Sequence, residues 1–97
     1  MQEKTVLVIE DNAMNMKLMR AVLKVGQYRM VEAGDAEIGI RLAREERPDL
    51  ILMDIQLPGM DGLSATRLLK EDPDLKEIPV LAMTGFARLK PAMSGSR

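Results

Sequence analysis

The sequence predicts a doubly wound α/β fold, in which helices cover both faces of one parallel sheet. Three observations indicate this fold class. Short apolar runs of strand length recur along the chain, stretches with helical spacing separate them, and glycine, proline or aspartate marks the boundaries. Strands that alternate with helices of this length form βαβ units, whose parallel crossovers are right-handed.

The composition limits the classes of protein that fit. The chain has 97 residues, enough for one small domain, and a formal net charge of -1. It has neither a basic stripe nor a basic amphipathic helix, so we expect no nucleic-acid or membrane partner. The absence of cysteine and histidine excludes disulfides, thiolate or imidazole metal ligands and a histidine base. The amino terminus contains no signal peptide or membrane span, which favours a cytoplasmic protein.

The first predicted strand, Thr5–Ile9, is an apolar run that ends in two acids, Glu10 and Asp11. A helix follows directly, and we expect Gly26 to end it as a left-handed cap. The residues at helical spacing that we expect on its inner face are Asn15, Leu18, Met19, Val22 and Leu23.

The second strand is predicted at Tyr28–Val31. The second helix begins after Asp35, whose side chain is a typical N-cap, and runs to about Glu46. The residues expected on its inner face are Ala36, Ile40 and Ala43.

The stretch Leu50–Gly62, LILMDIQLPGMDG, is the centre of the prediction. Its four leading apolar residues, Leu50–Met53, run straight into Asp54, as is typical of a strand buried on both faces of a parallel sheet. Asp54 then stands at the carboxyl end of a central strand, where open α/β sheets hold their ligands. The alternative is an aspartate that only caps the turn beginning near Leu57.

The remaining elements follow the same alternation. A third helix is predicted at Leu63–Lys70, and the Asp-Pro-Asp run at 72–74 ends it. Pro79 then introduces a fourth strand, Val80–Met83, which is followed by Thr84.

Four polar residues are expected at one edge of this sheet, because parallel strands share the edge where they end: Glu10, Asp11, Asp54 and Thr84. Carboxylates this close repel by up to about 4 kcal/mol per pair at an effective dielectric of about 20. A Mg²⁺ ion held by two carboxylates, a backbone carbonyl and water relieves the repulsion, as does protonation of one acid. Structural alternatives exist, because Glu10 and Asp11 favour the helix dipole and Thr84 suits an ordinary strand end.

Three motifs of the sequence form a specific combination. They are the acids Glu10 and Asp11 with Asn12 and Asn15 behind them, MDIQLPGMDG around Asp54, and MTGFA around Thr84. Together they resemble the receiver domain of bacterial response regulators, and among these the DivK-like single-domain regulators. The resemblance covers residues 4 to about 87.

The resemblance implies a flavodoxin-like receiver fold and a place in two-component signalling. Asp54 would accept a phosphoryl group from the phosphohistidine of a histidine kinase or histidine phosphotransfer protein, in agreement with the absence of histidine here. Asp11, Asp54 and the backbone carbonyl of Gln56 would bind Mg²⁺, with Glu10 acting directly or through water. Thr84 would turn toward the phosphoryl oxygens as a switch. The chain would be no enzyme beyond self-catalysed phosphorylation and dephosphorylation of Asp54.

The chain departs from the receiver pattern after Thr84. The pattern continues with a helix, a fifth strand ending in lysine and proline, and a last helix, whereas only 13 residues, GFARLKPAMSGSR, remain. A helix and a strand need on the order of twenty residues. We therefore expect a truncated receiver domain at 1–87, lacking the fifth strand and last helices, and an irregular or disordered tail at 88–97. Lys90 is then a solvated charge or, if the chain folds back, a phosphate contact.

Truncation predicts self-association. The fourth strand becomes an exposed apolar edge, and the first helix loses its neighbour. Three or four large apolar side chains left in water forfeit about 1.5 to 3 kcal/mol each, which is comparable with the stability of a small domain. We expect a homodimer or a domain-swapped oligomer that uses both surfaces.

Two functions therefore stay open from the sequence. The first is a receiver that is phosphorylated on Asp54. The second is a phosphorylation-defective module that acts by self-association. A flavodoxin-like nucleotide binder is disfavoured, because acids rather than a glycine-rich phosphate loop follow Ile9.

Overall fold

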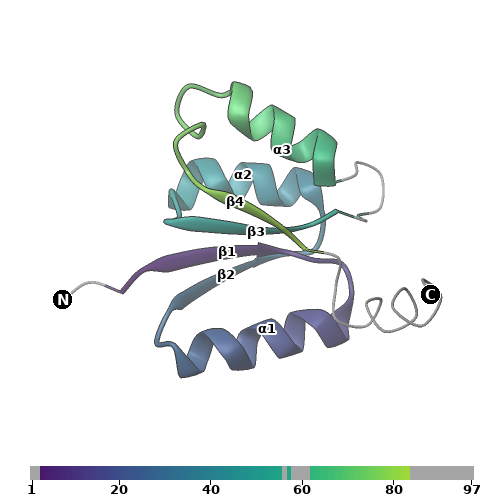
Figure 1. Cartoon of the computed structure of the whole chain (residues 1–97), viewed down its shortest axis with the longest axis vertical. Coiled ribbons are helices and arrows are strands. Elements are labelled where there is room, and N and C mark those ends of the chain that lie inside the picture. Colours follow the sequence, from purple (N-terminus) through teal and green to yellow (C-terminus); the bar gives the residue numbers. More distant parts are fainter. Residues whose placement is uncertain (1–2, 56, 58–61, 84–97) are drawn as a thin grey trace, which may run out of the picture.

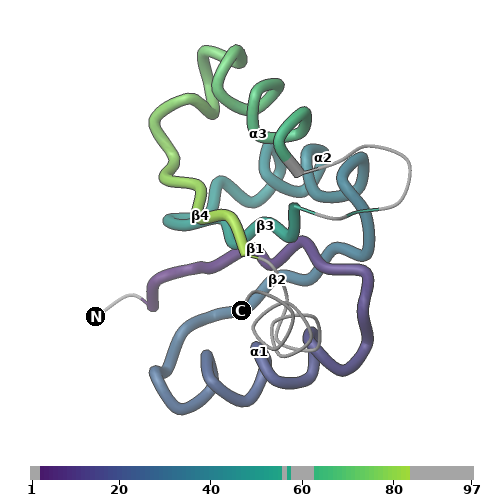
Figure 2. Tube along the Cα trace, turned by 45° about the vertical axis from the view of Figure 1, so that its right-hand side comes forward, coloured from purple at the N-terminus to yellow at the C-terminus, as the bar shows by residue number. Residues whose placement is uncertain are grey.

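A computed structural model of the chain describes residues 3–55, 57 and 62–83. Four parallel strands form one sheet in the order β2-β1-β3-β4, so that β1 and β3 lie inside it. Figures 1 and 2 show α1 on one face and α2 and α3 on the other, which confirms the predicted three-layer α/β fold. The elements in chain order are β1 (Thr5–Ile9), α1 (Ala13–Val25), β2 (Arg29–Ala33), α2 (Ala36–Glu46), β3 (Leu50–Asp54), α3 (Gly62–Glu71) and β4 (Val80–Met83).

Side chains of the inner strands alternate between two cores. The core beneath α2 and α3 includes Leu7, Ile9, Ile51, Met53, Leu69 and Leu75. The core beneath α1 consists of Val6, Val8, Met16, Met19, Leu23 and Leu52. Because both faces of β1 and β3 are covered, neither strand needs polar alternation, and both appear in the sequence as continuous apolar runs.

The register of the sheet aligns the carboxyl ends of its strands. Ile9 pairs with Met53, so the residues that follow them, Glu10 and Asp54, stand at the same level. Ile9 also pairs with Ala33 on the other side. The backbone N–H of Glu10 donates to the carbonyl of Ala33 at 3.0 Å, which extends the ladder by one residue. Residues far apart in the sequence are thereby brought to one edge.

Helix α2 confirms the prediction at its start. Oδ1 of Asp35 accepts a hydrogen bond from the N–H of Ile38 at 2.9 Å, the expected N-cap. The helix lies close to the sheet because position 39 is glycine: a Cβ on Gly39 would stand 2.7 Å from Cγ1 of Ile9. The predicted inner residues all contact or belong to the core beneath α2: Ala36, Ile40 and Ala43.

The inner face of α1 differs from the prediction. Its buried side chains are Asn15, Met16, Met19 and Leu23. Leu18 and Val22, which we expected to be buried, are 41% and 57% exposed. Helix α1 is apolar around most of its circumference, so more than one side of the helix has apolar residues at helical spacing. The side that packs on the sheet is the one that carries Met16.

The turn between α1 and β2 also differs. Gly26 has a φ of -77°, so the predicted left-handed glycine cap is wrong. The left-handed residue is Gln27, with a φ of 64°. Strand β2 occupies Arg29–Ala33 rather than Tyr28–Val31, because it pairs with β1 over all five residues of that strand.

The second half of the chain follows the prediction with small shifts. Strand β3 includes Asp54, and α3 extends one residue beyond the predicted range at each end. Strand β4 has the predicted bounds, Val80–Met83. The predicted boundary between 87 and 88 lies outside the described residues and stays a prediction. Among the helices of the described ranges, none has the length and apolar character of a membrane span.

Candidate metal centre

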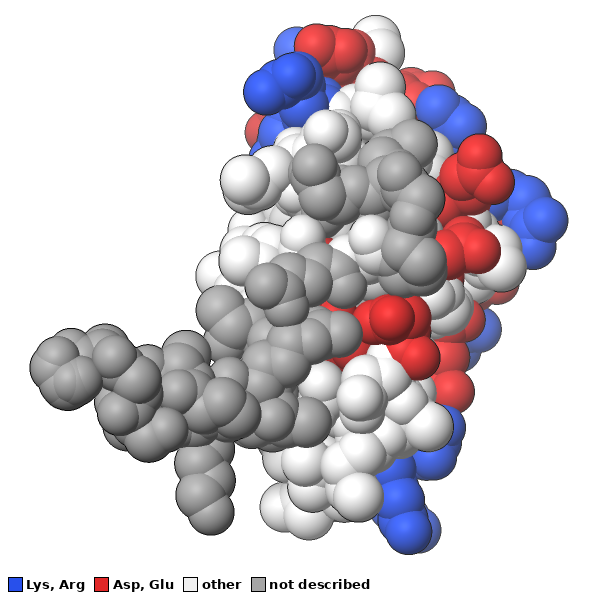
Figure 3. Space-filling model, turned by 90° about the vertical axis from the view of Figure 1, so that its right-hand side faces the viewer, with Lys and Arg blue, Asp and Glu red and all other residues white. Residues whose placement is uncertain are grey.

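Acidic side chains gather at the carboxyl edge of the sheet. Figure 3 looks onto this edge and shows a group of them near the middle of the face. Asp54 is the last residue of β3, and Glu10 and Asp11 directly follow β1. One carboxylate oxygen from each of the three acids lies within 4.8 Å of the other two. The structure therefore brings together three of the predicted site residues, here called the acid cluster.

The acid cluster has a buried floor and an open side. Glu10 and Asp54 are 2% and 0% exposed, whereas Asp11 is exposed to solvent. Acidic side chains are almost never fully buried unless they are paired or bind a cation. Asp11 is therefore the member of the acid cluster that faces solvent.

Burial raises the pKa of Glu10 from an ordinary 4.5 to about 7. The adjacent carboxyl of Asp54 raises this pKa further, whereas the backbone N–H of Asn12 and the side chain of Asn15 lower it. Without a metal ion, Glu10 therefore keeps its proton to a higher pH than an ordinary glutamate does. A proton on Glu10 reduces the repulsion in the cluster, which is also what a bound cation would do.

A hydrogen bond joins the start of α1 to the side chain of Glu10. The backbone N–H of Asn12 donates to Oε2 of Glu10 at 3.0 Å. Asn12 is also the N-cap of α1, because its Oδ1 accepts from the N–H of Asn15 at 2.9 Å. One oxygen of the Glu10 carboxylate is thus held by backbone.

The state of the other carboxylate oxygen of Glu10, Oε1, indicates whether a metal ion fits this site. It is buried and has no hydrogen-bond partner among the described residues. A buried acceptor left in this state costs about 1 to 3 kcal/mol. Mg²⁺ prefers oxygen ligands of this kind and usually keeps several waters, and the exposed Asp11 lies on the solvent side of the cluster. The donor set fits Mg²⁺.

The other predicted site residues, Gln56, Thr84 and Lys90, lie outside the described residues. Sequence reasoning found a further residue of the site but gave it no role. This residue is Asn15, which is 1% exposed and stands beside the Glu10 carboxylate. Its signal in the sequence is a polar side chain on an otherwise apolar helix face.

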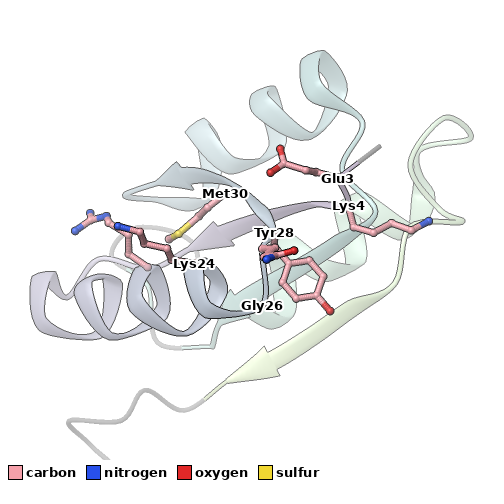
Figure 4. A pocket seen from close by; sticks show the side chains of 8 residues that line it. Glu3, Lys4, Lys24, Gly26, Tyr28 and Met30 are labelled. Carbon is pink, nitrogen blue, oxygen red and sulfur yellow. The ribbon is translucent and has the colours of Figure 1, made fainter. Parts of the chain in front are cut away.

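A cavity of about 630 Å³ lies at the opposite, amino-terminal end of β1 and β2. Lys4, Arg20 and Lys24 contribute to its lining. Figure 4 shows the amino groups of Lys4 and Lys24 pointing in opposite directions. The guanidinium of Arg20 is already bound by Glu32 through hydrogen bonds of 2.7 and 2.9 Å. The three cationic side chains of this cavity therefore do not converge on one point, and the acid cluster is the better candidate for a functional site.

An open parallel sheet with a cluster of acids at its carboxyl edge defines a receiver domain. The family model described as the response regulator receiver domain matches residues 6–95, and the chain belongs to this family, which serves two-component signalling. Among curated relatives, the polar-differentiation response regulator DivK of Brucella anthropi is 49% identical over 84 residues, or 87% of this chain and 68% of the relative. DivK of Brucella ovis is 48% identical over the same coverage.

Solved structures have the same fold. The N-terminal domain of a response regulator receiver protein from Methanoculleus marisnigri gives a TM-score of 0.80 at 35% identity, covering 82% of this chain and 65% of that one. The receiver domain of a sensor histidine kinase from Pseudomonas aeruginosa gives 0.82 at 33% identity, covering 95% and 75%. That structure has a magnesium ion coordinated in its active site cleft. The chain thus spans slightly less than two thirds of the Methanoculleus structure.

Proposed function

We propose that the chain accepts a phosphoryl group on the carboxylate of Asp54, with Mg²⁺ held by Glu10, Asp11 and Asp54. The observation that carries this proposal is the burial of two acids within 4.8 Å of a third, at the end of a central strand. The donor would be the phosphohistidine of a histidine kinase or histidine phosphotransfer protein. The chain would act as a phosphoacceptor that signals through protein contacts, limited to one phosphoryl group per chain.

The transfer requires an in-line nucleophile and compensation of negative charge, and little covalent work from the protein. An oxygen of Asp54 forms the new P–O bond as the P–N bond to the donor imidazole breaks, and the imidazole nitrogen keeps the electron pair. Bound Mg²⁺ would compensate the charge of the phosphoryl oxygens. The end of β3 is held by hydrogen bonding to β4, because the N–H of Ile55 donates to the carbonyl of Met83 at 3.0 Å. Asp54 is therefore presented from a rigid strand end.

Three further roles rest on the resemblance in sequence. The backbone carbonyl of Gln56 would be a Mg²⁺ ligand. The hydroxyl of Thr84 would donate to a phosphoryl oxygen and so report the modified state, since phosphorylation adds roughly 1.5 to 2 negative charges. Lys90 would contact the phosphoryl group if the chain folds back toward the acid cluster.

The proposal is tested by intact mass after incubation with acetyl phosphate, with and without Mg²⁺. We expect the wild-type chain to gain one phosphoryl group only when Mg²⁺ is present, and Asp54→Asn to gain none. Asp49→Asn is the matched control, because Asp49 lies at the amino-terminal end of β3, where its carboxylate accepts from the N–H of Thr5 at 2.8 Å. A folded wild-type chain that gains no mass would contradict the proposal.

A second candidate function, a self-associating module, is favoured by exposed apolar side chains on one side of the molecule. Arg20 of α1 binds Glu32 of β2, so that side of α1 faces β2. Leu18 and Val22 lie on the opposite side of the helix, toward β3 and β4, and both are exposed. Leu81 of β4 is 56% exposed. We call Leu18, Val22 and Leu81 the α1–β4 flank.

The occupant that we propose for this flank is a second copy of the chain. In the described part of the sheet, β4 pairs with β3 on one side and forms the edge on the other. Its four residues, VLAM, contain neither charge nor proline, the features that commonly protect an edge strand from pairing. Antiparallel pairing of two β4 strands about a two-fold axis would join the two sheets. Sedimentation velocity tests this, and a monomer at all concentrations would contradict it.

A further inference from the structure

The cavity at the amino-terminal end of β1 and β2 has an aromatic wall. Tyr28 contributes to its lining and is 45% exposed. The ring of Tyr28 packs closely over Gly26 at the end of α1, because a Cβ at position 26 would lie 2.7 Å from Cε2 of this ring. Gly26 has a φ of -77°, which any residue adopts, so the close approach of the ring is what requires glycine there. The cavity therefore presents a half-exposed ring that is held against the backbone.

Two lysines flank this ring. Lys4 directly precedes β1 and Lys24 lies in the last turn of α1, and both contribute to the lining. In the view of Figure 4, the ring of Tyr28 stands between their side chains, whose amino groups point in opposite directions. Among the described residues, neither lysine has an ion-pair partner, whereas Arg20 is paired with Glu32. Two cations are thus available on two sides of one aromatic surface.

We propose that this cavity binds an extended acidic segment of a partner protein. An apolar side chain of the segment would pack on Tyr28, and carboxylates on either side of it would pair with Lys4 and Lys24. Cations that diverge do not hold one compact anion such as phosphate, but they match carboxylates that are spread along a peptide. The charge of the lining agrees, since among its described residues three are cationic and only Glu3 is acidic.

The size and position of the cavity suit this partner. Its volume of about 630 Å³ lies within the range of about 300 to 1,000 Å³ that is typical of ligand sites. Met30 adds a flexible thioether to the lining, which can adapt to an apolar side chain. The acid cluster lies at the other end of the strands and would repel an acidic segment, so the charge distribution favours this end. The inference is independent of phosphoryl transfer to Asp54.

The first test measures binding of a fluorescent synthetic peptide to the full chain by anisotropy. The peptide has glutamates on both sides of a central phenylalanine, and a control peptide has lysines in place of the glutamates. We expect only the acidic peptide to bind, and to bind more weakly as the salt concentration rises. Equal binding of the two peptides, or no binding of the acidic one, would overturn the proposal. Tighter binding of a single-stranded oligonucleotide of equal charge would also overturn it and assign the cavity to nucleic acid.

The second test locates the site with two variants of equal net charge. Lys24→Glu places a like charge in the lining, and we expect the acidic peptide to bind at least about 10-fold more weakly. Lys17→Glu is the matched control, because Lys17 is an exposed lysine of the same helix outside the lining. We expect this variant to keep close to the wild-type affinity. Equal weakening in both variants would mean that the peptide responds only to net charge, which overturns the proposal.

The third test moves the aromatic wall without changing any charge. Gly26→Ala adds a Cβ that would collide with the ring of Tyr28, so the ring must shift. We expect the acidic peptide to bind roughly 2- to 10-fold more weakly, which is the contribution of an aromatic contact. Gly34→Ala is the control, because nothing lies within 4 Å of a Cβ at that position. The same affinity in both variants would overturn the assignment of Tyr28 as the surface on which the segment packs.

Discussion

The acid cluster and the α1–β4 flank are both unfavourable in the isolated chain, but for opposite reasons. The cluster buries carboxylates close together, whereas the flank leaves Leu18, Val22 and Leu81 in water. A cation or a proton relieves the first, and an apolar partner relieves the second. Each region therefore indicates the chemistry of the partner that it would bind: a cation or proton at the acid cluster, and an apolar surface at the α1–β4 flank. The two regions can be tested independently.

The largest expected effect is a loss of Mg²⁺ affinity when the acid cluster is changed, with no effect on the α1–β4 flank. Asp11→Asn removes the charge of the exposed member and leaves the buried packing intact, since Asp11 lies at the open side. We expect Mg²⁺ to bind at least about 100-fold more weakly, because loss of a ligand exceeds loss of a group behind it. Calorimetric titration with Mg²⁺ measures this. The sedimentation coefficient should stay that of the wild-type chain. A change in it would contradict the independence of the acid cluster and the α1–β4 flank.

A smaller effect is expected at the flank. Leu81→Lys places a charge on β4, and we expect it to weaken self-association at least about 10-fold, because a buried leucine contributes about 1.5 to 3 kcal/mol. The matched control is Leu68→Lys on α3, since Leu68 is 45% exposed on the other face of the sheet. Sedimentation velocity across a range of concentrations compares them. Equal effects of the two substitutions would mean that β4 is not the contact.

The last expected effect concerns stability rather than binding, and is a pH dependence of unfolding in the metal-free chain. Folding raises the pKa of Glu10 from 4.5 to about 7, mainly through burial, so the folded chain binds a proton more tightly than the unfolded chain. The resulting stability is fully present below about pH 4.5 and is lost as the pH rises through 7. Urea unfolding at pH 5, 6, 7 and 8 measures it. Glu10→Gln should flatten this decline, and an equally steep decline in that variant would assign it to another group.

Much of the fold follows from local sequence. The apolar runs predicted β1 and β4 with their observed bounds, and Asp35 predicted the start of α2, because strand burial and N-capping act over a few residues. Tertiary contacts decided the rest. Contact with the sheet buries the side of α1 that carries Met16 and leaves Leu18 and Val22 exposed, although both sides have apolar residues at helical spacing.

The acid cluster was predictable because parallel strands end at one edge, so that Glu10, Asp11 and Asp54 had to meet. The contribution of Asn15 was not, because spacing placed it on the inner face of α1 but could not say which side chain it would meet there. The left-handed residue after α1 was also missed, since glycine is the usual choice and Gln27 takes that conformation instead.

The central claim is that a proton on Glu10 and a bound Mg²⁺ ion are alternative ways to relieve the same cluster of acids. Calorimetric titration of the metal-free chain with Mg²⁺ at pH 7, in two buffers with different ionisation enthalpies, measures ion binding and proton release together. Because the pKa of Glu10 is raised in the metal-free chain, we expect one Mg²⁺ to bind per chain and to release protons as it binds. Binding without proton release, or no binding, would contradict the claim.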